Sequence, residues 1–155
     1  MFRFFYINGR QQDLARTHSY LCRLLRTKAY LLGSRYYVNP DWFLYILTDL
    51  CARCPGDGAL KEMRTLLGRE VNGRMGCDKD TLGAALRLLS AQALGLSNDR
   101  DLDTVLESQQ LDGGWERVWL WQYGKEALKI GSRGVITAMA LRGIQQARLQ
   151  CNGNH

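Results

Sequence analysis

Apolar side chains recur every three or four residues along most of the chain, and polar side chains occupy the positions between them. This spacing is typical of amphipathic helices, because residues three and four apart lie on the same helix face. Only two prolines interrupt the pattern. We therefore predict an all-α fold, with helices at about residues 11–32, 40–53, 58–72, 79–95, 101–110 and 133–150.

Three segments lack a clear helical period. Residues 1–7 are apolar apart from one arginine and are predicted to be the end of a buried helix. Residues 116–131 are rich in aromatic side chains and are predicted to be an ordered loop with a short turn of helix. Residues 151–155 are predicted to be a disordered tail. Residues 1–150 are thus expected to form a single α-helical repeat domain.

Glycines divide the predicted helices into a repeat. Gly33, Gly76 and Gly131 each stand before one of the predicted helices, at intervals close to the length of two helices and their turns. Each repeat is therefore expected to contain an outer helix, a glycine turn and an inner helix. The later inner helices are rich in Gly, Ala, Ser and Thr, and such small residues permit close packing of helices.

A further motif predicts a helix whose end is covered by the chain that follows it. A helix can run to about Gln110, after which Asp112-Gly113-Gly114 supplies a chain reversal, because glycine adopts positive φ without steric cost. The indole ring of Trp115 can then cover the helix end. We call this segment the clasp; its residues are Gln109, Asp112, Gly113, Gly114 and Trp115.

The clasp resembles the QW motif of the terpenoid cyclase and protein prenyltransferase toroids. Residues 29–37, 40–45, 112–116 and 130–134 together look like the C-terminal part of uncharacterised fungal proteins with a predicted terpenoid-cyclase-like toroid. This resemblance implies that the three helical hairpins form about half of an α/α toroid. It also implies that hairpins upstream of the chain would complete the ring.

The resemblance leads to two hypotheses about function. The first is a terpenoid-cyclase-like toroid fragment that binds an isoprenoid or another lipid-like ligand. Such a fragment is expected not to be catalytic alone, because an open half-ring cannot exclude water from a carbocation, whereas upstream hairpins could complete a class II terpene cyclase. The alternative is a non-catalytic helical-repeat scaffold for protein–protein interaction.

Two aromatic clusters near the glycine turns are candidates for ligand contact. Aromatic ring faces stabilise carbocations in cyclases and can line an apolar pocket. The alternative for these rings is packing in the core, and the alternative for the two arginines beside them is hydrogen bonding to helix-end carbonyls. The ligand-binding candidates are Arg35, Tyr36, Tyr37, Trp42, Trp119, Tyr123 and Arg133.

One acidic motif resembles the Asp-X-Asp-Asp motif with which class II terpene cyclases protonate an alkene. Asp101 and Asp103, in Asp101-Leu102-Asp103-Thr104, are therefore catalytic candidates. Their place at the start of a predicted helix equally suits carboxylates that cap the helix. Asp78 or Asp80 is expected to cap the start of the preceding predicted helix, at about residues 79–95.

Charge and cysteines narrow the choice of partners. The net charge is +6, but the 21 basic residues are interspersed with 15 acidic ones, so nucleic acid is not predicted as a partner. Five cysteines and no signal peptide favour a reducing, cytoplasmic compartment. Cys51 and Cys54 form a lone CxxC pair without a nearby histidine, so neither a metal nor a cofactor is predicted. No apolar run is long enough for a transmembrane segment, and exposed half-ring faces predict self-association.

Overall fold

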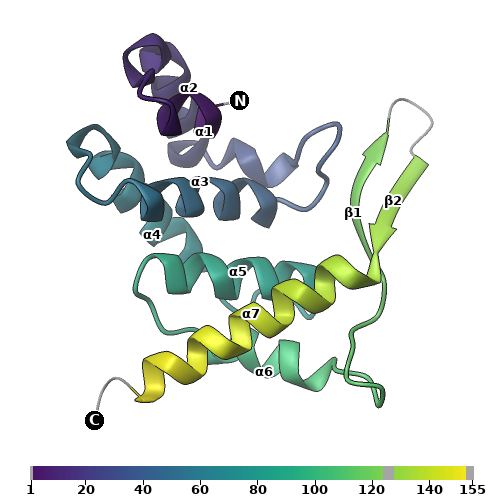
Figure 1. Cartoon of the computed structure of the whole chain (residues 1–155). Helices are drawn as coiled ribbons and strands as arrows, with labels where there is room; N and C mark the ends of the chain where they lie inside the picture. Colours follow the sequence, from purple (N-terminus) through teal and green to yellow (C-terminus); the bar gives the residue numbers. More distant parts are fainter. Residues whose placement is uncertain (1, 124–127, 153–155) are drawn as a thin grey trace.

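The computed structural model describes residues 2–123 and 128–152 and is predominantly helical (Figure 1). Its α-helices are α1 (Phe2–Ile7), α2 (Ala15–Arg26), α3 (Asp41–Arg53), α4 (Lys61–Arg74), α5 (Thr81–Ala93), α6 (Asp99–Glu107) and α7 (Arg133–Asn152). Short 3-10 helices lie at Gln11–Leu14, Ala29–Leu32 and Gly58–Leu60. Within the described ranges, every helix is too short or too polar to span a bilayer.

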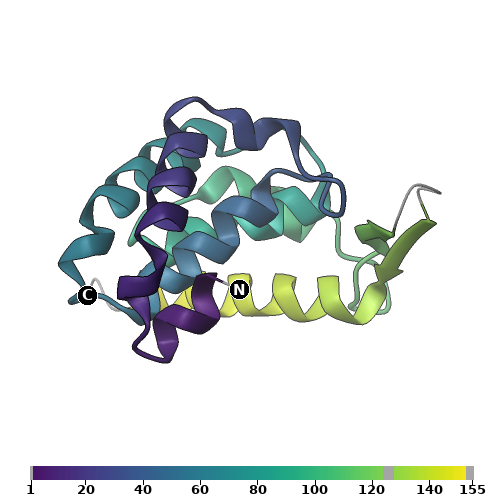
Figure 2. The same cartoon turned by 90° about the horizontal axis from the view of Figure 1, so that it is seen from above.

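The helices lie in two layers. Helices α3, α5 and α7 pack side by side, with α5 between the other two. Helix α4 packs against α2, α3 and α5, and α6 packs against α5 and α7. Figures 1 and 2 show α7 running along one side of the helical body. In Figure 1, α1 and α2 lie at the top of this body, and α6 and α7 lie in its lower half. The helices predicted as inner ones are therefore neighbours of one another.

Short polar side chains begin the helices that frame the candidate site. Asp80 accepts a hydrogen bond from the backbone N–H of Gly83 at 2.8 Å, which satisfies a donor at the start of α5. The prediction that this aspartate starts a helix is therefore confirmed. Asn98, and not Asp101, is the cap of α6, because its side chain accepts from the backbone N–H of Asp101.

The predicted loop at residues 116–131 is instead an antiparallel β-hairpin. Strand β1 (Val118–Tyr123) pairs with β2 (Leu128–Ser132), and the register shifts between Trp119 and Trp121. The prediction of an all-α fold is therefore wrong in this segment. Val, Trp and Tyr favour strands, and the irregularity in register breaks the alternation by which a strand is recognised in a sequence.

The N-terminal segment also differs from its prediction. Residues 2–7 form the short helix α1, in which Tyr6 is buried, Phe2 and Phe5 pack partly buried against the core, and Phe4 and Ile7 are exposed, so this helix is only partly buried. The predicted helix at 11–32 is divided, because Lys28 adopts a left-handed conformation with φ of 56° between α2 and the 3-10 turn at Ala29–Leu32. Helix α7 extends to Asn152, and residues 153–155 of the predicted tail lie outside the described residues.

Two groups of buried side chains form the core. One lies among α2, α3 and α4, and the other surrounds Trp115 among α5, α6 and α7. Every residue from Leu82 to Ala91 of α5 is buried, so this helix is the centre of the fold. Gly143 of α7 allows close approach, since a Cβ there would lie 2.8 Å from the Leu88 side chain.

Candidate functional site

The clasp residues form a tight turn closed by their own hydrogen bonds. Gly113, with φ of 81°, donates its backbone N–H to the Gln110 carbonyl, and the backbone N–H of Gln110 donates to the Gly114 carbonyl. The Gln109 amide donates to the Gly113 carbonyl at 2.8 Å. Trp115 is fully buried, and its indole N–H donates to the Val105 carbonyl near the end of α6 at 2.7 Å. The indole ring is thus fixed against α6.

Arg133 joins the clasp to the start of α7. Its guanidinium donates to the Trp115 carbonyl at 2.9 Å, to the Gln110 side chain at 3.0 Å and to the Asp112 carboxylate. The hydrogen bond from Arg133 lowers the pKa of Asp112. Arg133, which was predicted to contact a ligand, therefore lies at the clasp and donates a hydrogen bond to a backbone carbonyl there.

An aromatic groove lies between α2 and α3, with a volume of about 370 Å³. Two of the predicted ligand residues, Tyr37 and Trp42, lie in its wall, with ring centroids 5.9 Å apart. Tyr30 stacks on Phe43 at 5.6 Å and is anchored from behind by a hydrogen bond to the buried Glu70. The main side chains of the aromatic groove are Tyr20, Leu24, Tyr37, Trp42, Phe43 and Ile46.

Trp42 has one unusual polar atom. Its Nε1 is buried and has no hydrogen-bond acceptor within the described ranges. A buried donor without an acceptor is energetically costly, and most native structures provide a partner. The indole N–H of Trp42 is therefore an unpaired donor, within the described residues, on a side chain that also lines the aromatic groove.

A second, charged cavity of about 780 Å³ lies between the start of α5 and the β-hairpin. Asp78 and Asp80 lie on the α5 side, whereas Trp119, Arg117 and Lys129 belong to the hairpin. The turn at Asn39 and Pro40 lines both this cavity and the aromatic groove. The two spaces are therefore neighbours that share one wall.

A buried ionic network forms the floor of the charged cavity. Arg87, the only charged residue of α5, is fully buried and donates to Asp101 at 2.8 Å, to Asp41 at 2.9 Å and to Asp78 at 3.2 Å. Arg74 donates two further hydrogen bonds to Asp41, at 2.6 and 3.0 Å. The network joins α3, α4, α5 and α6. Sequence reasoning missed it, although a lone arginine in an otherwise apolar helix is a usable signal, since buried charges require partners.

The two catalytic candidates have different surroundings. Asp101 is buried, and it accepts hydrogen bonds from Arg87, from the Asn98 amide at 2.8 Å and from the Gly76 N–H at 3.2 Å. Asp103 is exposed. The structure therefore does not bring these two carboxylates together in a cavity.

The same Asp-X-Asp-Thr spacing occurs a second time, at Asp78-Lys79-Asp80-Thr81, and both of its aspartates line the charged cavity. Desolvation of Asp78 acts to raise its pKa, but Arg87 and hydrogen bonds outweigh this effect, so the pKa of Asp78 is lowered. Asp78 is consequently ionised near neutral pH and is not a proton donor.

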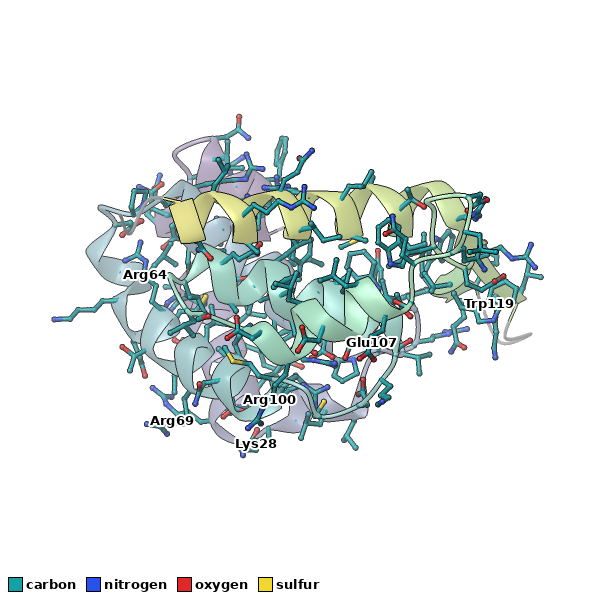
Figure 3. The ribbon with its side chains drawn as sticks, turned by 90° about the horizontal axis from the view of Figure 1, so that it is seen from below. Lys28, Arg64, Arg69, Arg100, Glu107 and Trp119 are labelled. Atoms are coloured by element: carbon teal, nitrogen blue, oxygen red, sulfur yellow. The ribbon has the colours of Figure 1, made fainter. Side chains whose placement is uncertain are left out.

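The other predicted residues lie at the surface. Arg35, Tyr36 and Tyr123 are exposed, and none of them lines the aromatic groove or the charged cavity. The Arg35 guanidinium lies over the Tyr36 ring at 5.9 Å. Trp119 lines the charged cavity and is half exposed. Figure 3 shows its side chain on the β-hairpin, at one end of the molecule.

The CxxC pair lies at the end of α3. Burial raises the pKa of Cys51 to about 11, so this thiol is protonated and unreactive near neutral pH. No cluster of three or more His, Cys, Asp or Glu side chains suited to a metal ion occurs in residues 2–123 and 128–152.

Comparison with known proteins relates the chain to terpenoid cyclases. No family model matches the chain, and no solved structure matches it. The chain is 31% identical over 146 residues to Drimenol cyclase drtB of Aspergillus calidoustus, a terpenoid cyclase. The match covers 94% of this chain and 28% of that protein, so the chain spans less than a third of the relative's length. The predicted resemblance to terpenoid cyclases is confirmed.

Proposed function

We propose that this chain is a terpenoid-cyclase-like part of an α/α toroid and binds an isoprenoid or another lipid-like ligand. The aromatic groove is the observation that supports ligand binding most directly. Its volume of about 370 Å³ falls in the range of small-molecule sites, and its walls are mainly aromatic and aliphatic. An isoprenoid alcohol suits it, because a hydrocarbon tail matches these apolar walls.

The arrangement of the helices supports the toroid part of the proposal. Helix α5 lies between α3 and α7, α4 packs against α3 and α5, and α6 packs against α5 and α7. This order is expected when successive helical hairpins stack around an axis. Three hairpins would then supply about half of the ring, and the greater length of the relative leaves room for others.

We also propose that the chain is not catalytic alone. Protonation of an alkene needs a carboxylic acid that stays protonated in an apolar cavity. Asp101 is held by Arg87, Asp103 is exposed, and the pKa of Asp78 is lowered. None of these carboxylates has the required surroundings, so farnesyl diphosphate incubated with the chain should give no cyclised product by gas chromatography.

Calorimetric titration with farnesol tests the groove. The double variant Tyr37→Ala/Ile46→Ala removes two groove side chains that are already partly exposed, so the fold should tolerate it. Loss of their apolar contact should weaken farnesol binding about tenfold. The matched double variant Tyr123→Ala/Val135→Ala removes similar side chains away from the groove and should leave affinity within about twofold. Equal affinities of the two variants would refute the groove, and no farnesol binding by the unaltered chain would favour the scaffold hypothesis.

Self-association is a further part of the proposal. Phe4 and Ile7 on α1, and Leu141 and Leu149 on α7, are exposed apolar residues. Apolar surface in contact with water favours association by about 25 cal/mol per Å² buried. Light scattering across a dilution series should therefore give a mass that falls on dilution. A constant monomer mass at high concentration, without binding of a dye for apolar surfaces, would contradict this prediction.

A further inference from the structure

The β-hairpin is hydrogen-bonded to a loop that lies far from it in the sequence. Gln122 of β1 donates its backbone N–H to the Tyr36 carbonyl at 2.8 Å and its side-chain amide to the Arg35 carbonyl at 3.0 Å. Both carbonyls belong to the loop at residues 33–40, which joins the 3-10 turn at Ala29–Leu32 to α3. Figure 1 shows this loop beside β1.

The 33–40 loop is also closed by its own contacts. The Ser34 N–H donates to the Tyr37 carbonyl at 2.7 Å, and the Tyr37 N–H donates to the Ser34 hydroxyl at 3.0 Å. Gly33 has φ of 66°, and a Cβ there would lie 2.5 Å from the Val38 carbonyl oxygen, so the two ends of the loop touch. The loop is therefore a compact unit, and its orientation depends on its contacts with the rest of the chain.

This loop carries part of the wall of the aromatic groove. Tyr37 lines the groove, with its ring 5.9 Å from the ring of Trp42. In the described part of the chain, Gln122 supplies the only hydrogen bonds between residues 34–38 and another element. Gln122 itself lines the charged cavity and not the aromatic groove. The hairpin can therefore fix the position of Tyr37 from outside the groove.

We propose that Gln122 is a positioning residue for the aromatic groove, because it holds the 33–40 loop in the orientation that places Tyr37 in the groove wall. The inference rests on the proposed binding of an isoprenoid in this groove. A loop anchored only at its two ends samples more orientations, and a ligand then has to order the loop as it binds. Gln122 removes part of this cost in advance, so it contributes to affinity without contact with the ligand.

Calorimetric titration of the full chain with farnesol tests the role of the side-chain amide. Gln122→Met keeps the length of the side chain but removes its N–H donor, so it should bind farnesol about fivefold more weakly. Gln122→Arg retains an N–H donor and should bind within about twofold of the unaltered chain. Lys129→Ala is the matched control, because Lys129 is paired with Gln122 in the register and also lines the charged cavity. It makes no hydrogen bond to the loop within the described residues, so its loss should change affinity by less than about twofold.

Hydrogen–deuterium exchange gives a second readout, on the loop itself. The amides of residues 34–38 should exchange about fivefold faster in Gln122→Met, and at an unchanged rate in Lys129→Ala. The melting temperature of each variant should stay within about 4 °C of that of the unaltered chain. Weaker binding at unchanged thermal stability would identify a positioning role, since a purely structural role would lower both.

Several results would overturn the inference. Gln122→Met that binds farnesol as tightly as the unaltered chain, or loop exchange that is unchanged in this variant, would overturn it while leaving the proposed function intact. Gln122→Arg that binds as weakly as Gln122→Met would also overturn it, because the N–H donor would then not be the cause. If the unaltered chain bound no farnesol, the proposed function and this inference would fail together.

Discussion

Replacing Trp115 with alanine should lower the free energy of unfolding by about 3 to 5 kcal/mol. The indole ring is fully buried in the core shared by α5, α6 and α7, so alanine would leave a large cavity. The substitution also removes the donor to the Val105 carbonyl, which would lose its 2.7 Å hydrogen bond near the end of α6. Urea denaturation followed by circular dichroism measures the change.

Trp119→Ala is the matched control for this prediction. The same side chain is half exposed on the β-hairpin, so its loss should cost less than about 1 kcal/mol. A change below about 0.5 kcal/mol for Trp115→Ala would show that the clasp does not stabilise the fold. A similar loss of unfolding free energy in the two variants would mean that the burial of Trp115 adds no more stability than the half-exposed Trp119 does.

The helices were predictable because their apolar spacing and caps agree. Asp80 starts α5 as expected, and each predicted helix from residue 40 onward overlaps an observed one. The division of the predicted helix at 11–32 was not predictable from spacing, because it depends on the left-handed conformation of Lys28, a residue with no intrinsic preference for it.

The β-hairpin was missed for a different reason. Its strands are short, and the register shift between Trp119 and Trp121 disturbs the two-residue alternation. Pairing between Trp119 and Gly131 is a tertiary property that neither segment encodes alone. The sequence predicts two aromatic clusters near the glycine turns, but the distribution of Trp119 and Tyr123 between the charged cavity and the surface depends on this hairpin.

The candidate site was predictable only in part. Tyr37 and Trp42 were selected as aromatic residues near a glycine turn, and they do line the aromatic groove. The burial of Arg87 was not predictable, because the carboxylates that make a buried arginine tolerable come from three other segments of the chain, at Asp41, Asp78 and Asp101. Asp41 and Asp101 are 46 and 14 residues away from it in sequence.

Replacing Arg87 with methionine should destabilise the chain by about 3 to 5 kcal/mol. Methionine preserves much of the apolar volume, but it leaves the buried Asp41 and Asp101 without the guanidinium that bridges them. An uncompensated buried carboxylate is costly, whereas the intact pair contributes much less than its removal costs. Chemical denaturation of the variant at neutral pH measures the loss.

Two further variants separate burial from charge. Arg53→Met breaks the partly exposed pair with Asp49 and should cost less than about 1 kcal/mol. Adding Asp101→Asn to Arg87→Met should recover part of the loss, because the amide is neutral and can still bond to Asn98 and the Gly76 N–H. Equal costs for Arg87→Met and Arg53→Met, or no recovery in the double variant, would contradict the network's role.

If the network does hold the four helices together, Arg87→Met should also weaken the shared wall at Asn39 and Pro40, since Asp41 begins α3 directly after it. Farnesol binding should then fall in Arg87→Met but not in Arg53→Met, even in conditions where both variants are fully folded.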